Sequence, residues 1–190
     1  MVADDVMDAF ICIIQNSLTI VPYRYKKRAS ITQPLALFMS MQEDAHDTTI
    51  AMIGDATRNM HDVEIVILPI IMNGHFHVVV LDNDKQEYIH YSSCQRKEYD
   101  KDALEMRNLF NLCIDMEFGE SVTVKYPLVQ ESVDCAVYVM WFIEQLLADE
   151  KLQLPQTDVP YLRLNYVSRI LKEGRAADIT ARGECSKVGL

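Results

Sequence analysis

Three runs of β-branched and aromatic residues within residues 63–93 constrain the fold more than any other feature of this sequence. Residues 63–70 (VEIVILPI) form a continuous apolar run that is typical of a buried strand, and residues 75–82 (HFHVVVLD) form a second one. Residues 87–93 (EYIHYSS) are predicted as a third strand. The polar residues 83–86 (NDKQ) are turn formers, so the last two runs are expected to pair as a hairpin around which the rest of the chain packs.

Helical patterns surround these strands, whereas residues 17–60 have no clear period. The segments predicted as helices are 5–16, 101–118, 134–149 and 160–172. Asp134 stands where an N-cap is expected, and residues 121–129 are predicted as a further strand. The order of helix, sheet, helix, strand and helix indicates one α+β domain over residues 1–173, followed by a mobile tail at 174–190.

Composition narrows the possible functions. The net charge of −10 disfavours nucleic-acid binding, which depends on Lys and Arg that neutralise phosphates. The five cysteines are an odd number without a CxxC motif, so we expect no disulfide framework, metal site or cofactor, and a reducing intracellular compartment, nuclear or cytoplasmic. No apolar run reaches the roughly 18 residues of a membrane span, so we expect no membrane association. The basic cluster at 24–28 is a solvated loop, or alternatively a site for an acidic partner or a nuclear address.

Cys135 and His75 are the candidates for chemistry. Cys135 lies at the expected first turn of an apolar helix, where partial positive charge and unpaired N–H groups stabilise the reactive thiolate. His75 opens a predicted strand, and its ordinary pKa near neutrality suits a general base. Each residue alone is more simply explained as structural. Together they match the pattern of a nucleophile and base that are distant in sequence and adjacent in the fold.

Two stretches around these residues carry a resemblance to a known family. Residues 68–84 (LPIIMNGHFHVVVLDND) and residues 130–142 (QESVDCAVYVMWF) resemble the His and Cys segments of the ubiquitin-like-protein (SUMO) protease family of papain-like cysteine peptidases. The resemblance extends over residues 4–150 and is greatest for the plant, often transposon-associated, branch. It implies a papain-like α+β domain of the adenain and ubiquitin-like protease type, with a central mixed sheet flanked by helices.

The resemblance also implies roles for individual residues. Cys135 would be the nucleophile and His75 the general base, while Gln130 and the backbone N–H of Cys135 would form the oxyanion hole. The implied reaction is acyl transfer through a thioester, which is then hydrolysed. The implied partners are ubiquitin-like modifiers that end in Gly-Gly, cut from precursors or from lysine side chains.

Ser92 occupies the position at which the family has an aspartate that orients the histidine. If Asp84 and Lys85 form the turn, His75 faces Cys94, and Ser92 projects from the same face one diagonal step away. A serine hydroxyl accepts a hydrogen bond from the ring. It provides no charge to stabilise an imidazolium, so the predicted triad is incomplete.

The chain departs from the family pattern at two further positions. Gln130 is one residue closer to Cys135 than the family spacing, and Ala136 replaces the usual glycine. His77 shares a strand face with the predicted base, so it is either a substitute base or a partly exposed sheet histidine. Asp82 lies on the opposite face and is a poor candidate for the orienting group.

Three hypotheses follow from these features. The first is an active thiol peptidase or isopeptidase that acts on a SUMO-type modifier. The second is a catalytically impaired pseudoprotease that binds a protein without cutting it. The third is an unrelated α+β domain, which predicts that Cys135 and His75 lie far apart.

Overall fold

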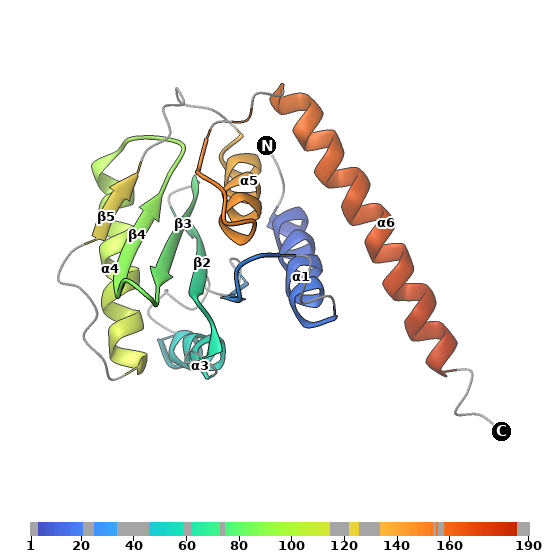
Figure 1. Cartoon of the computed structure of the whole chain (residues 1–190), viewed down its shortest axis with the longest axis horizontal. Helices are drawn as coiled ribbons and strands as arrows, with labels where there is room; N and C mark the ends of the chain where they lie inside the picture. The colour runs from blue at the N-terminus through green and yellow to red at the C-terminus, as the bar shows by residue number, and fades with distance from the viewer. Residues whose placement is uncertain are drawn as a thin grey trace.

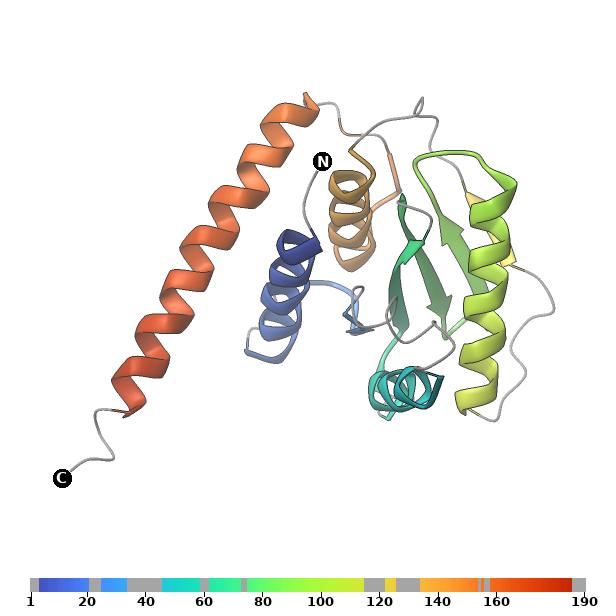
Figure 2. The same ribbon diagram turned by 180° about the vertical axis from the view of Figure 1, so that it is seen from behind.

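The protein has a central sheet with helices on both sides. The computed structural model describes residues 4–20, 25–33, 46–58, 62–72, 75–114, 122–125, 134–153, 155 and 158–185. Its helices are α1 (Asp4–Ile20), α3 (His46–Thr57), α4 (Lys97–Ile114), α5 (Cys135–Leu147) and α6 (Val159–Cys185). Figures 1 and 2 show α1, α5 and α6 on one side of the sheet and α4 on the other. This arrangement confirms the predicted α+β fold class.

The sheet is mixed, with strands in the order β1-β2-β3-β4-β5. The strands are β1 (Ala29–Ile31), β2 (Ile65–Met72), β3 (His75–Asp82), β4 (Glu87–Tyr91) and β5 (Val122–Lys125). The three central strands pair antiparallel, and the edge strands β1 and β5 pair parallel to their neighbours. The three predicted central strands and the hairpin at 83–86 are therefore confirmed. The strand predicted at 121–129 is confirmed over β5, and its residues 121 and 126–129 lie outside the described residues. Strand β1 falls in a region for which no element was predicted.

Alternation along β3 divides the core into two layers. Phe76, Val78 and Val80 pack in the cluster that contains α1 and α5. Val79 and Leu81 point to the other face and pack with side chains of α3 and α4. Each buried valine contributes about 1.5–3 kcal/mol relative to an exposed one. All eight residues of β3 are buried, which explains the apolar run from Val78 to Leu81 and means that the polar side chains of His75, His77 and Asp82 need partners inside the protein.

Helix boundaries differ from the predictions most in three helices. Helix α1 continues to Ile20, beyond the predicted end at residue 16. Helix α4 begins at Lys97 rather than 101 and ends at Ile114. The predicted end of the last helix at residue 172 is wrong, because α6 continues through Gly174 to Cys185. A glycine weakens a helix by about 1 kcal/mol without terminating it. The mobility of residues 174–190 stays a prediction.

Helix α6 is attached to the domain through one end and projects beyond it (Figure 1). Tyr166 packs edge-on against Phe10 with 5.4 Å between ring centroids, and its hydroxyl donates to Glu144 of α5. Arg169 forms an ion pair with the same Glu144. None of the described helices combines the length and apolar character needed to cross a membrane.

Candidate active site

His75 and Ser92 meet where β3 begins and β4 has just ended. His75 Nε2 lies 3.0 Å from Ser92 Oγ, and both side chains are buried. The antiparallel register pairs Val78 with Tyr91, so its continuation sets His75 opposite Cys94 and leaves Ser92 one diagonal step away. The geometry expected from a turn at 84–85 is confirmed.

The hydrogen bonds of Ser92 determine which ring nitrogen of His75 carries a proton. Ser92 Oγ donates its single proton to the carbonyl of Cys94 at 2.8 Å and accepts the N–H of the same residue at 3.2 Å. It has no second proton, so it accepts from Nε2–H of His75. The neutral ring therefore has a bare Nδ1, which is the nitrogen available to act as a base.

Burial is the main reason why His75 is in its neutral form. Burial, followed by the charges of His90 and Arg96, lowers the pKa of His75 to about 4. The base is thus ready to accept a proton near pH 7. The same causes oppose the imidazolium once it forms, and the neutral Ser92 provides no charge to offset them.

Tyr99 covers one face of the His75 ring. The two rings stack with centroids 4.1 Å apart and an interplanar angle of 12°. An aromatic face attracts a cation with about 0.5–2 kcal/mol, so Tyr99 favours the imidazolium over the neutral ring. The sequence analysis missed this residue because α4 brings it to the site from outside the two motifs, and no local pattern distinguishes it.

Cys135 is the first residue of α5 and reaches the beginning of β3. The backbone N–H of Phe76, which follows His75, donates to Cys135 Sγ at 3.4 Å. Burial raises the pKa of the thiol, while hydrogen bonds from the backbone N–H groups of Phe76, Ala136 and Cys135 itself oppose that rise. The structure therefore brings the two predicted residues together, contrary to the hypothesis of an unrelated domain.

Asp134 does not have the capping role predicted for it. Its side chain makes no cap hydrogen bond to α5. It forms an ion pair with Arg163 of α6, and this pairing turns the carboxylate away from the free N–H groups of the helix. Ala136 is buried beside the nucleophile, and Gln130 lies outside the described residues, so its oxyanion role stays a prediction.

His77 is fully buried, so the expectation of a partly exposed sheet histidine is wrong. Helix α4 covers this face of the sheet, and His77 Nδ1 lies 2.8 Å from Nε2 of His90 on β4. Asp102 and Asp100 of α4 lie at the ends of this pair. Among the described residues, no group of three or more His, Cys, Asp or Glu side chains is arranged to hold a metal ion.

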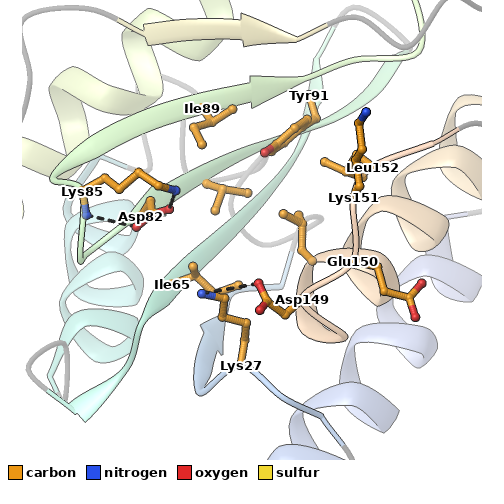
Figure 3. A pocket seen from close by; sticks show the side chains of 12 residues that line it. Lys27, Ile65, Asp82, Lys85, Ile89, Tyr91, Asp149, Glu150, Lys151 and Leu152 are labelled. Atoms are coloured by element: carbon orange, nitrogen blue, oxygen red, sulfur yellow. Dashed lines mark hydrogen bonds and ion pairs between the residues drawn. The ribbon is translucent and has the colours of Figure 1, made fainter.

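A cavity of about 420 Å³ lies away from these residues, at the other end of α5 (Figure 3). Asp82 lines it and pairs with Lys85, which confirms that Asp82 faces away from His75. Lys27 and Asp149 form another ion pair at its edge. Helix α5 begins at Cys135 and rises about 1.5 Å per residue, so roughly 18 Å separates its two ends. The cavity is not part of the candidate active site.

Comparisons with known proteins agree with this geometry. The model of the Ulp1 protease family, C-terminal catalytic domain, matches residues 1–177. A putative ubiquitin-like-specific protease 1B of Arabidopsis thaliana is 22% identical over 121 residues, which cover 58% of this chain and 35% of that relative. This plant relative is in keeping with the branch suggested by the resemblance.

Solved structures have the same fold. The SUMO protease Ulp1 with its catalytic cysteine oxidised to a sulfenic acid has a TM-score of 0.71 at 15% identity, covering 91% of this chain and 78% of that one. The C-terminal Ulp1 protease domain in complex with SMT3, the yeast ortholog of SUMO, has a TM-score of 0.66 at 14% identity and covers 91% and 77%. The chain described here belongs to the Ulp1 protease family and contains its C-terminal catalytic domain.

Proposed function

We propose that this protein is a cysteine peptidase that cleaves a ubiquitin-like modifier of the SUMO type from precursors or conjugates. The observation that carries the proposal is the meeting of Cys135, at the first turn of α5, with the beginning of β3, where His75 has a bare Nδ1. The Ulp1 domain with the same fold is bound to a SUMO ortholog, which supports a partner of this class. Such a substrate places the protein inside the cell, in the nucleus or cytoplasm.

The proposed reaction uses His75 as the general base. Nδ1 of His75 accepts the proton of Cys135, and the thiolate attacks the carbonyl carbon of the terminal glycine. The backbone N–H of Cys135, with Gln130 as the second donor, stabilises the oxyanion. Collapse of the tetrahedral intermediate releases the amine, which takes the proton from the imidazolium and leaves a thioester. A water molecule that His75 deprotonates then hydrolyses the thioester.

Ser92 makes this peptidase slower than a relative with an aspartate. Replacing the corresponding aspartate by a neutral group in a serine peptidase lowers the rate by about four orders of magnitude, chiefly because the wrong tautomer forms. Here the hydrogen bonds of Ser92 retain the correct tautomer of His75. The rate is still lower because Ser92 lacks the negative charge with which an aspartate stabilises the imidazolium. The stacked ring of Tyr99 partly offsets this loss.

A panel of ubiquitin-like proteins with C-terminal reporters or electrophilic warheads tests the proposal. The protein should turn over or trap one of them, and Cys135→Ala should abolish the reaction while still binding the same modifier. A folded protein that reacts with no member of the panel would contradict peptidase activity.

The alternative function is a pseudoprotease that binds a modifier without cutting it. The neutral Ser92 and the burial that raises the pKa of Cys135 favour this alternative. Alkylation of Cys135 by iodoacetamide near pH 7 distinguishes the two, because only an activated thiolate reacts much faster than an ordinary buried thiol. Slow alkylation together with binding of a modifier would support the pseudoprotease.

A further inference from the structure

A row of four titratable side chains lies next to His75 and has no part in the proposed reaction. His77 and His90 are both fully buried, and His77 Nδ1 lies 2.8 Å from His90 Nε2. Helix α4 places a carboxylate at each end of this pair. Asp100 Oδ1 lies 3.4 Å from His90 Nδ1, and Asp102 Oδ2 lies 3.9 Å from His77 Nε2. We refer to these four residues as the proton row.

The proton row is one proton short of complete hydrogen bonding. It contains three contacts, and each needs one proton. Two neutral imidazoles carry two N–H protons, and two ionised carboxylates carry none. The contact between His77 and Asp102 is the longest and exceeds hydrogen-bond distance. His77 Nε2 has no hydrogen-bond partner in the described part of the chain, and the contact between His90 and Asp100 is the shorter one, so we assign the missing proton to the contact between His77 and Asp102.

The proton row is close enough to His75 to influence it. The rings of His75 and His77 have centroids 5.9 Å apart, and Tyr99 contacts both. The titratable and charged groups around the pair are His75 on β3, Arg96 before α4, and Tyr99, Asp100 and Asp102 on α4. Its register partners on β2 and β5 are Ile70 and Val124, which do not titrate. A positive charge on the pair repels a positive charge on His75.

We propose that the proton row takes up one proton between His77 and Asp102 as the pH falls, and that the added charge prevents His75 from becoming an imidazolium. The proton comes from solvent, and no other bond is broken. The control of His75 rests on the proposed peptidase function, because that reaction requires the imidazolium. His77 acts through His75 and is a positioning residue.

Burial of the pair agrees with the neutral state near pH 7. It lowers the pKa of His77 and of His90, although Asp100 opposes the shift at His90. The charge of His90 also lowers the pKa of His75, which is the direction that the proposal requires. Loading of the proton row is therefore expected on the acid side of neutrality.

Nitrogen NMR of the whole protein with labelled histidines tests the proton row directly. Near neutral pH, His90 Nδ1 should be protonated and His77 Nε2 should be bare. Acidification from about pH 7 to about pH 3 should protonate the bare nitrogen in a single step, because burial lowers the pKa of both rings, to about 4 for His90. A pair whose protonation state stays constant over this range would overturn the proposal. The measurement needs no catalytic activity.

Asp102→Asn is the matched variant. Its amide N–H can donate to the bare Nε2 of His77 and complete the third contact without an added proton. The protonation step should therefore disappear. Asp84→Asn, in the exposed hairpin turn, removes the same charge and should leave the step unchanged. Near-ultraviolet circular dichroism verifies that both variants are folded, and a step that persists in folded Asp102→Asn would overturn the proposal.

The pH dependence of Cys135 alkylation tests the coupling to His75. In the wild type, a proton on the proton row and a proton on His75 each stop the reaction in acid. The rate of Cys135 alkylation should therefore fall by up to about a hundredfold per pH unit. In Asp102→Asn only the proton on His75 remains, and the rate should fall by about tenfold per pH unit. An alkylation rate that falls equally steeply with decreasing pH in the two proteins would refute the coupling between the proton row and His75. A protonation step without turnover of any modifier would count against the proposed function and leave the proton row intact.

Discussion

The two faces of β3 differ in chemistry, although they belong to the same eight residues. Phe76, Val78 and Val80 point toward α5 and meet apolar side chains. His75 and His77 alternate with them and meet aromatic, imidazole and carboxylate groups from β4 and α4. Apolar contact satisfies the first face, whereas every buried polar atom on the second needs a partner. Substitutions of the apolar residues on the α5 face should therefore change stability, and those of the histidines on the α4 face should change activity and pH response.

The largest expected effect is that of His75→Gln. Loss of the general base should lower kcat/KM for a modifier substrate by at least about a thousandfold, because the nearest other imidazole, that of His77, is fully buried and its ring centroid lies 5.9 Å from that of His75. The matched substitution on the opposite face is Val80→Ala. It should lower the free energy of unfolding by about 2 kcal/mol and leave the kcat/KM of the folded protein unchanged. Equal losses of activity in both variants would mean that the two faces of β3 do not differ in their contribution to catalysis.

Acid should destabilise the protein, because it protonates the buried His75 on the α4 face of β3. The pKa of His75 falls from 6.5 to about 4 on folding, so the unfolded state binds the proton more tightly. The stabilisation is complete above pH 6.5 and is lost as the pH falls toward 4. The loss from this residue is about 3 kcal/mol at most. Urea unfolding across this range should show it, and His75→Gln should flatten the profile. If the free energy of unfolding of His75→Gln fell with decreasing pH as much as that of the wild type, the acid sensitivity would not come from His75.

Ser92→Asp adds a negative charge next to His75 on the α4 face. A carboxylate beside Nε2 should raise the pKa of His75 and increase kcat/KM by about tenfold to a hundredfold. Ser92→Ala is the opposite control, because it removes the acceptor that selects the tautomer, and should lower kcat/KM by about tenfold. Equal rates in the three proteins would mean that Ser92 has no influence on the base.

The smallest expected effect belongs to Tyr99. Tyr99→Leu removes the aromatic face and should lower kcat/KM by about threefold to thirtyfold, whereas Tyr99→Phe retains the ring and should stay within about twofold of the wild type. Steady-state kinetics with one modifier substrate decides between these outcomes. A loss of equal size in both variants would assign the effect to the hydroxyl rather than to the stacking.

The candidate site was predictable wherever strand periodicity and hairpin register determine position. A turn at 83–86 sets which residues of β3 and β4 face each other, so Ser92 could be placed beside His75 from the sequence. Residues of α4 could not be placed in this way, because a helix joins the sheet through contacts that its own pattern does not specify. Tyr99, Asp100 and Asp102 entered the site through that packing.

The sequence by itself determined the α+β class, the central strands, the nucleophile at a helix start and the histidine at a strand start. These features follow from local periodicity and from two motifs. The partners of the buried polar groups became known from the three-dimensional arrangement of the chain. It paired His77 with His90, turned Asp134 toward Arg163 and stacked Tyr99 on His75. The physical reason is that burial makes each polar atom depend on its nearest neighbour in space, which folding brings from a distant part of the chain.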